Sequence, residues 1–323
     1  MMEHFPVFDL HCDTAFELWK RSEGLLANSC HIDLLRASTL MHHHQFFAFC
    51  TYGAEGDKYG LPAPEPLLEQ MLADFMIKVS KFSDRIALCR TAQDLVKANK
   101  AQKCAAFLSL EGAEGIGCDE GRLEELKEFG FSTINLTWNS ANDLAGSCHT
   151  GEGLTAKGKS FVKKAQSMGF VIDVSHLSDK AFWDLVTISQ GPIIASHSNC
   201  RAVCDHPRNL TDEQIKVICN LDGIVGVNLY APFLNESGKA TFDDVRRHID
   251  HVLDLGGQHH LCLGGDLDGC DVLPEGFFDI TSLNDLAKHL IDGGLEETLV
   301  LNIFNNNAVR FLLQHLTDEP ALS

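Results

Sequence analysis

Pro6-Val7-Phe8-Asp9-Leu10-His11-Cys12-Asp13 is an apolar run that leads directly into a His-x-Asp pair. The run is typical of a buried strand. Side chains two residues apart on a strand point to the same face. We therefore expect the imidazole of His11 and the carboxylate of Asp13 to converge at the end of this strand. The pair predicts half of a metal site, and the remaining ligands should follow other strands.

Seven further short apolar runs follow along the chain, and most of them lack the polar alternation of a half-exposed strand. Such runs are typical of strands that are buried on both faces, as in a parallel sheet. Segments with helical periodicity separate the runs. The pattern predicts an α/β fold, a (β/α)8 TIM barrel formed by a single domain over residues 1–323. The predicted strands are Pro6–Leu10, Gln45–Thr51, Ala105–Leu110, Thr133–Leu136, Val171–Asp173, Ile193–Ser196, Ile224–Asn228 and Leu261–Gly264.

Three of the segments between the strands carry clear helix signals. Thr211-Asp-Glu-Gln214 has the pattern of a capping box and predicts a helix over Ile215–Cys219. Gly158–Met168 and Phe242–Leu255 place apolar residues on one helical stripe. A long segment rich in Gly, Asn and Ser, residues 138–155, precedes the first of these two helices. Loops that follow barrel strands lie over the catalytic face, so we expect this insertion to shape the substrate entrance.

Ionisable side chains follow five of the predicted strands directly. Because the carboxyl ends of all barrel strands meet at one rim, these side chains should gather in one cluster there. Imidazole and carboxylate ligands without thiolates suit Zn²⁺, with Mn²⁺ or Co²⁺ as alternatives. The cluster therefore predicts a metal-dependent hydrolase. Its members are His11, Asp13, Glu111, His176, His197 and Asp266.

The number of ligands predicts two metal ions. We expect Glu111 to bridge them, with the His11–Asp13 pair on one ion and the pair of His176 and His197 on the other. Two ions in such sites lie about 3.5–4 Å apart, and a water molecule between them becomes hydroxide near neutral pH.

A further carboxylate should handle the proton of that water. Asp266 is the candidate, since it can accept the proton and pass it to a leaving amine. Asp268 is the alternative, because two carboxylates two residues apart can share a face.

Composition limits the choice of partner. The chain has 323 residues, of which 45% are hydrophobic, enough for one large core. Its formal net charge is −19. A surface of this charge repels phosphate backbones and anionic lipid headgroups, so we expect neither nucleic acid nor a membrane surface as a partner.

The cysteines indicate the compartment. Twelve are present, but no two have Cys-x-x-Cys spacing. The first predicted strand begins within ten residues of Met1, which leaves no room for a secretory leader. No apolar run reaches transmembrane length. We expect reduced thiols and a cytoplasmic location.

Several other polar residues have a structural explanation. His42-His43-His44 looks like a metal cluster, but adjacent side chains on a strand or helix do not converge, so we expect a loop and the start of a strand there. Cys12 should point away from its neighbours into the core. Asp9 and Asp173 are expected to orient ligands or to accept backbone N–H groups.

Six motifs, which run in order between residues 6 and 313, resemble the membrane (renal) dipeptidase family, peptidase family M19, of the amidohydrolase-like superfamily. His-x-Asp alone occurs throughout that superfamily, whereas the segments around His176, His197 and Arg208 are much more specific. The motifs are Asp9-Leu-His-Cys-Asp-Thr14, Ser109-Leu-Glu-Gly112, Asp173-Val-Ser-His-Leu-Ser178, Ser196-His-Ser-Asn199, Pro207-Arg-Asn-Leu210 and Gly265-Asp-Leu-Asp-Gly269.

The resemblance implies a zinc dipeptidase with two metal ions on a TIM barrel. Carried over by position, the same five ligands hold the two zinc ions. Asp266 handles the proton and meets the free amine of the substrate, and Arg208 binds its terminal carboxylate. A guanidinium suits that role because it binds a carboxylate bidentately. The resemblance also implies dipeptide substrates, including some with a C-terminal D-residue, and a homodimer.

One position departs from the family pattern. Family members carry a histidine directly after Leu-Thr at the end of the fourth strand, where it contacts the substrate, but here Trp138 follows Thr137. Asn139 is the candidate for the missing polar contact. The change leaves open an alternative, in which a related enzyme with two metal ions acts on another small amide or ester, such as an N-acyl amino acid, a cyclic amide or a lactone. A metal-bound barrel that only binds a partner is the third hypothesis.

Overall fold

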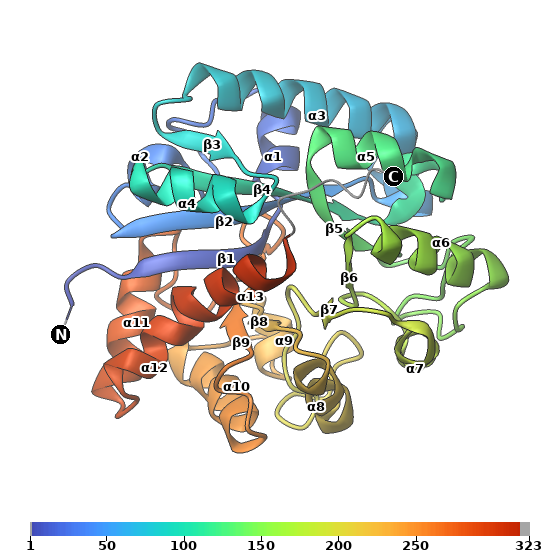
Figure 1. The fold of residues 1–323 in the computed structure, drawn as a ribbon. Coiled ribbons are helices and arrows are strands. Elements are labelled where there is room, and N and C mark those ends of the chain that lie inside the picture. The colour runs from blue at the N-terminus through green and yellow to red at the C-terminus, as the bar shows by residue number, and fades with distance from the viewer. Residues whose placement is uncertain (1, 317–323) are drawn as a thin grey trace.

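The strands form one parallel sheet, which curls into a barrel. The computed structural model describes residues 2–316. Within this range, eight strands follow the order β7-β6-β5-β4-β2-β1-β9-β8, and β3 pairs with β4 beside this path. The helices surround the strands (Figure 1). The strands are β1 (Pro6–Cys12), β2 (His42–Cys50), β3 (Ile86–Leu88), β4 (Cys104–Glu111), β5 (Phe131–Asn135), β6 (Val171–Asp173), β7 (Ile193–Ile194), β8 (Val225–Val227) and β9 (Leu261–Leu263).

The barrel closes between β7 and β8. Ala195 and Val225 form a parallel bridge, in which the Ala195 N–H donates to the Ile224 carbonyl at 3.0 Å. Closure requires glycine at two positions, because a Cβ at Gly226 or Gly264 would collide with the Ser196 carbonyl oxygen. The predicted TIM barrel is therefore confirmed.

Helices connect the strands and cover the outside of the barrel (Figure 1). The predicted capping box is present, since the side chains of Thr211 and Gln214 each bond the other's backbone at the start of α8. The α-helices are α1 (Thr14–Arg21), α2 (Leu34–Ala37), α3 (Pro64–Lys81), α4 (Ala92–Lys100), α5 (Leu123–Phe129), α6 (Ala156–Ser167), α7 (Asp179–Ile188), α8 (Asp212–Asn220), α9 (Ala231–Leu234), α10 (Phe242–Asp254), α11 (Ser282–Asp292), α12 (Glu297–Leu301) and α13 (Asn307–His315). Shorter helical segments are η1 (Gly53–Tyr59), η2 (Ala113–Ile116), η3 (Glu120–Arg122) and η4 (Asn302–Asn306).

Two apolar clusters form the core. The larger one lies between strands and helices, and the smaller one includes inward-facing strand residues. In the smaller cluster, the rings of Phe8, Phe46 and Phe107 pack with centroids 5.1–6.1 Å apart. Each ring lies four residues before the end of its strand. The rings therefore close the barrel beneath the rim that carries the polar residues.

The structure corrects several strand bounds. Strand β3 was not predicted, because three residues are too short for a periodic signal. Strand β7 ends at Ile194, and the N–H of Ser196 donates to the side-chain carboxylate of Asp173 at 3.0 Å. Strand β8 ends before Asn228, whose N–H donates to the Asn199 side chain.

The histidine triplet is also corrected. All three residues belong to β2, so no part of the triplet is loop. The Nε2 of His43 lies 3.1 Å from Gln45 Oε1, and the Nδ1 of His44 accepts the Ala105 N–H at 3.1 Å.

The cysteines, Asp9 and Asp173 lie where the sequence predicts. All twelve cysteines are free, and Cys12 is fully buried in the larger cluster. Asp9 accepts the N–H groups of His11 and Gly265, and Asp173 accepts those of Ser175 and Ser196. Both carboxylates therefore tie together the ends of neighbouring strands.

Candidate metal centre

The end of β1 carries a bulge that aims His11 at the barrel axis. Between the pairs Asp9–Gln45 and Cys12–Phe47, two residues of β1 lie opposite one residue of β2. A bulge re-aims the side chains that follow it. Asp13 lies one residue beyond the strand and caps α1 with φ −95°. The predicted convergence is present, with His11 Nε2 and Asp13 Oδ2 3.6 Å apart, although only His11 lies on the strand.

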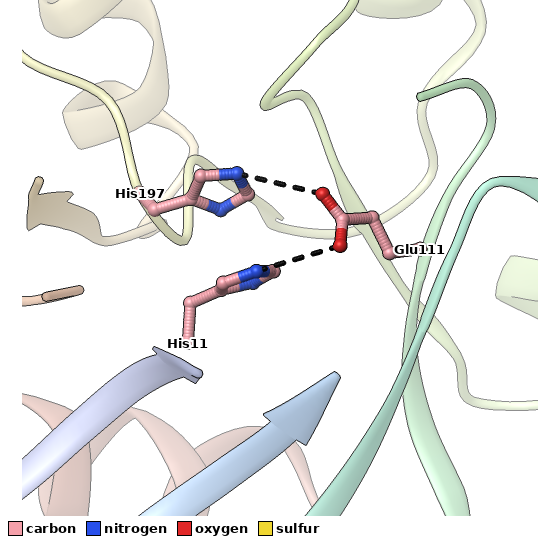
Figure 2. Close-up of side chains that lie close together, drawn as sticks. All are labelled: His11, Glu111 and His197. Atoms are coloured by element: carbon pink, nitrogen blue, oxygen red, sulfur yellow. Dashed lines mark ion pairs between the residues drawn. The ribbon is translucent and has the colours of Figure 1, made fainter. Parts of the chain in front are cut away.

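Glu111, the last residue of β4, lies between two groups of imidazoles. Its Oε2 is 3.5 Å from His11 Nε2, and its Oε1 is 2.9 Å from His176 Nε2 and 3.8 Å from His197 Nε2. Figure 2 shows the carboxylate facing the rings of His11 and His197. Each oxygen of Glu111 therefore faces a different side of the centre.

Acceptor atoms meet on one side of Glu111. His197 Nδ1 lies 2.6 Å from Ser196 Oγ, and His176 Nδ1 lies 3.0 Å from Asn139 Oδ1. When these Nδ1 atoms carry the protons, both Nε2 atoms present lone pairs. The two Nε2 atoms are 3.0 Å apart and both face Glu111 Oε1. Facing lone pairs repel each other unless a cation lies between them.

Atoms that could bind a metal ion also gather on the His11 side of Glu111. Both ring nitrogens of His11 and Oε2 of Glu111 are buried without a hydrogen-bond partner among the described residues. Such atoms are costly to bury, and metal coordination satisfies them. Two groups of ligand atoms lie within 4.8 Å of one another: His11 with Glu111 and His197, and His11 with Asp13 and Asp266. The residues present therefore fit metal ions on both sides of Glu111.

Burial and neighbouring charges set the ionisation of these groups. Burial lowers the pKa of His176 to about 3, with the Arg208 guanidinium acting in the same direction, so its imidazole is neutral. For His11, burial lowers the pKa, but the nearby carboxylates of Glu111 and Asp13 outweigh it and raise the pKa well above its usual value. Burial raises the pKa of Asp13 to about 7. The carboxylates around His11 thus favour a positive charge there.

Asp266, rather than Asp268, belongs to the centre. Its Oδ1 lies 3.9 Å from His11 Nε2, and its Oδ2 accepts a hydrogen bond of 2.9 Å from Asn228. Asp268 bonds Thr14 and the backbone of His31 instead. Asp266 has φ 56°, a left-handed conformation that is strained for a residue with a side chain. His176 shares this feature with φ 73°.

Arg208 reaches the centre from the loop between β7 and α8. The side chain is buried with 5% exposure, and its Nη2 donates to His176 Nε2 at 3.0 Å. It forms no ion pair with any carboxylate in residues 2–316. A buried guanidinium without an anion is costly, so this position favours an anionic ligand.

A cavity of about 510 Å³ opens over the centre. The volume is in the range of small-molecule sites, about 300–1,000 Å³. Trp138, Asn139 and His149 of the insertion over residues 138–155 are part of its lining. Other lining residues include Asp13, Glu111, His176, Arg208, Tyr230 and Asp266.

Two functional neighbours were not predicted from the sequence. Asn228 holds Asp266 from the end of β8, and Ser196 holds His197. Both are the last residues of predicted strands, so the rule that the carboxyl ends of barrel strands share one rim applies to them as well. Asn139, expected as a substrate contact, lines the cavity and also bonds His176.

Comparison with known protein families supports a metal site of imidazoles around a shared carboxylate. The model of the membrane dipeptidase family, peptidase family M19, matches residues 1–319. The chain belongs to this family. Because the family consists of metallopeptidases that act on dipeptides, it supports a metal-dependent hydrolase with a small peptide substrate.

Known relatives are similar over most of their length. A protein in the pqqA 5′ region of Klebsiella pneumoniae is 33% identical over 77% of this chain and 96% of its own. An uncharacterized dipeptidase of Schizosaccharomyces pombe is 31% identical over 68% of this chain and 56% of its own. The crystal structure of a metallopeptidase from Rhodobacter sphaeroides, with a phosphinate mimic of L-Ala-D-Ala bound, is 28% identical with TM-score 0.88, over 97% of this chain and 100% of that chain.

The Rhodobacter sphaeroides protein, which shares this fold, was solved with the dipeptide mimic as its ligand. In residues 2–316 of this chain, no helix combines the length and the apolar character that crossing a membrane requires.

Proposed function

We propose that the protein is a zinc dipeptidase that hydrolyses the peptide bond of dipeptides, including some with a C-terminal D-residue. The observation that carries the proposal is the set of facing acceptor atoms around Glu111 in a buried cavity. The relative that binds a mimic of L-Ala-D-Ala supports the D-residue. Mn²⁺ and Co²⁺ are the alternative metals.

Five residues would hold two ions. The pair of His11 and Asp13 would hold one, the pair of His176 and His197 the other, and Glu111 would bridge them. When bound, the ions would supply a water molecule acidic enough to act near neutral pH and would polarise the scissile carbonyl.

The protein's own groups would orient the substrate and move the proton. Asp266 would accept a proton from the attacking water and deliver it to the leaving amine, since burial raises the pKa of its carboxyl from the usual value. Asn228 fixes Asp266 through a hydrogen bond of 2.9 Å. Arg208 would bind the terminal carboxylate, and Asn139 would contribute a polar contact beside His176. A carboxylate site at one end and Asp266 at the other would exclude longer peptides.

A substrate panel tests this proposal. The zinc-loaded protein is assayed on L-Ala-L-Ala, L-Ala-D-Ala, L-Ala-L-Ala-L-Ala and N-acetyl-L-Ala, and its metal content is measured by elemental analysis. We expect two ions per chain and cleavage of the dipeptides alone. Equal rates on the tripeptide would contradict the length limit. Cleavage of N-acetyl-L-Ala without any dipeptide would favour the alternative enzyme, which Trp138 in place of a histidine motivates.

The substitution Arg208→Ala tests the carboxylate site. Loss of a charge-assisted pair costs roughly 2–5 kcal/mol, so KM should rise at least tenfold. Arg201→Ala is the matched control, because Arg201 lies on the same loop but pairs with Asp179 at 2.7 Å away from the centre. Unchanged kinetics in Arg208→Ala would remove Arg208 from the site.

The cysteines bear on the location of the protein, and the family resemblance bears on its assembly. Twelve free cysteines favour a reducing compartment, and we propose the cytoplasm. The homodimer implied by the family resemblance stays a prediction, which light scattering would test.

A further inference from the structure

One side of the cavity is formed by four aromatic rings, Phe16, Tyr52, Tyr59 and Trp138. We refer to these residues as the aromatic wall. Tyr52 lies at its centre, with ring centroids 4.9 Å from Phe16, 5.4 Å from Tyr59 and 4.8 Å from Trp138. The rings come from α1, from η1 and from the segments that follow β2 and β5. Segments far apart in sequence thus build one continuous apolar surface.

The wall begins at the metal centre. The Trp138 ring lies 6.3 Å from the ring of His176, and Trp138 precedes Asn139, which bonds His176. Tyr52 follows Cys50, which is the register partner of Glu111. A side chain of a substrate bound at the centre would therefore meet the wall directly.

The wall is not simply part of the core. Trp138 is half-buried, and Tyr59 at the outer end is 60% exposed. Large aromatic groups on a cavity surface gain free energy when a ligand covers them. Tyr52 adopts φ 59°, an uncommon conformation for a tyrosine, which the surrounding structure must hold in place. The wall therefore has the features of a preformed binding surface.

Charge around the cavity favours an apolar occupant for the wall. Lys20, which lines the cavity, lies over the Phe16 ring at 5.5 Å and pairs with Glu17 at 3.6 Å, and Lys58 beside Tyr59 pairs with Glu55 at 3.3 Å. The cavity carboxylates Asp266 and Asp271 come from the segment after β9. Among residues 2–316, the lysines at the wall are therefore already paired with carboxylates, which disfavours an acidic side chain of the substrate there.

We propose that the aromatic wall is a subsite for an aromatic or large aliphatic side chain, so that the preferred substrates are dipeptides with at least one such residue. This inference rests on the proposed dipeptidase function. It assigns to Trp138 a role in selecting the substrate, in place of the polar contact that a histidine would make.

Kinetics on matched dipeptides test the subsite. The zinc-loaded enzyme is assayed on L-Ala-L-Ala, L-Phe-L-Ala, L-Ala-L-Phe and L-Glu-L-Ala. We expect kcat/KM at least tenfold higher for one of the phenylalanine dipeptides than for L-Ala-L-Ala, and no gain for L-Glu-L-Ala. Equal values for all four would overturn the subsite while leaving the dipeptidase function intact.

Variants assign the preference to the wall. Tyr59→Ala and Trp138→Ala should each reduce, several-fold, the ratio of kcat/KM for the preferred phenylalanine dipeptide to kcat/KM for L-Ala-L-Ala, mainly by raising KM for the phenylalanine dipeptide. Phe278→Ala is the matched control, because Phe278 is 78% exposed and does not line the cavity. A preference that survives both wall substitutions would contradict the proposal. If the protein hydrolyses no dipeptide, the proposed function fails. Isothermal titration calorimetry with the same dipeptides then tests the wall, because the phenylalanine dipeptides should still bind more tightly than L-Ala-L-Ala.

Discussion

Glu111 has two oxygens that serve two separate clusters of acceptors. One oxygen faces His11 and the other faces His176 and His197. The carboxylate is 2% exposed, so water does not screen these contacts. A carboxylate in this position can connect two cations.

Gly269 provides room for the ligands, and this gives a prediction. A Cβ at this position would collide with Asp13 Oδ2 and Asp266 Oδ1, although the glycine backbone itself is not strained. Gly269→Ala should therefore reduce bound metal by at least one ion per chain, as measured by elemental analysis. Gly191→Ala is the control, because nothing lies within 4 Å of a Cβ there. Full metal content in Gly269→Ala would show that the two carboxylates are not both ligands or neighbours of ligands.

Asn139 should act on the metal centre through His176. The hydrogen bond of 3.0 Å to His176 Nδ1 orients the ring, and loss of such partners lowers metal affinity about 10–100-fold. We expect Asn139→Ala to weaken zinc binding by this factor in a chelator competition. Ser140→Ala, which removes a neighbouring hydrogen bond to Glu55, should leave affinity unchanged. If Asn139→Ala changes only KM, Asn139 is a substrate contact instead.

At the scale of elements, some residues of the centre lie on strands and others lie on the short segments that follow the strands. The strands supply His11 and Glu111, whereas Asp13, His176, His197 and Asp266 lie just beyond strand ends. Backbone hydrogen bonds to Asp9 and Asp173 hold these short segments in place. His176 and Asp266 can adopt a left-handed backbone conformation because the surrounding structure holds the segments before and after them in place.

The loop that carries Arg208 ends at the capping box of α8, which can be tested separately from catalysis. Thr211 Oγ1 accepts the Gln214 N–H, and Gln214 Oε1 accepts the Thr211 N–H at 2.8 Å. Thr211→Ala should lower the free energy of unfolding by about 1 kcal/mol in urea denaturation. Thr187→Ala, on the exposed surface of α7, should cost less. Equal losses in both variants would mean that the box adds nothing beyond helix propensity.

At the scale of the whole molecule, buried neutral histidines link stability to pH. Burial lowers the pKa of His43 to about 4, that of His44 to about 3 and that of His248 to about 4. The Nδ1 of His248 accepts the Cys200 N–H, so it has no room for a proton. Each of these groups binds a proton more readily in the unfolded chain than in the folded one.

His248 provides a prediction with a definite sign. Its folded pKa lies below the ordinary value of 6.5, so its contribution is complete above pH 6.5 and is lost as pH falls toward 4. The free energy of unfolding should fall by about 3 kcal/mol over this range from His248 alone. Urea denaturation at pH 7.5 and 4.5 measures the loss, and His248→Gln should reduce the difference between the two values. His289→Gln is the control, since His289 is an exposed histidine paired with Asp243. An identical pH dependence in His248→Gln would contradict the link.

The sequence by itself determined the barrel and the members of the cluster. Buried parallel strands must be continuously apolar, and a barrel must bring the ends of all its strands to one rim. Polar residues placed directly after apolar runs are therefore close in space, whatever their separation along the chain. This argument identified His11, Asp13, Glu111, His176, His197 and Asp266, and the structure brings their side chains together.

Only the tertiary structure decided how these side chains face one another. The bulge in β1, the left-handed backbone at His176 and Asp266, and the contact of Asn139 with His176 depend on neighbouring strands that are distant in sequence. The aromatic wall has the same origin, because Phe16, Tyr52 and Trp138 meet only when the barrel brings the ends of β1, β2 and β5 to one rim. Spacing along a chain fixes which residues reach the rim, whereas ring orientation and shared cavity walls depend on packing between segments.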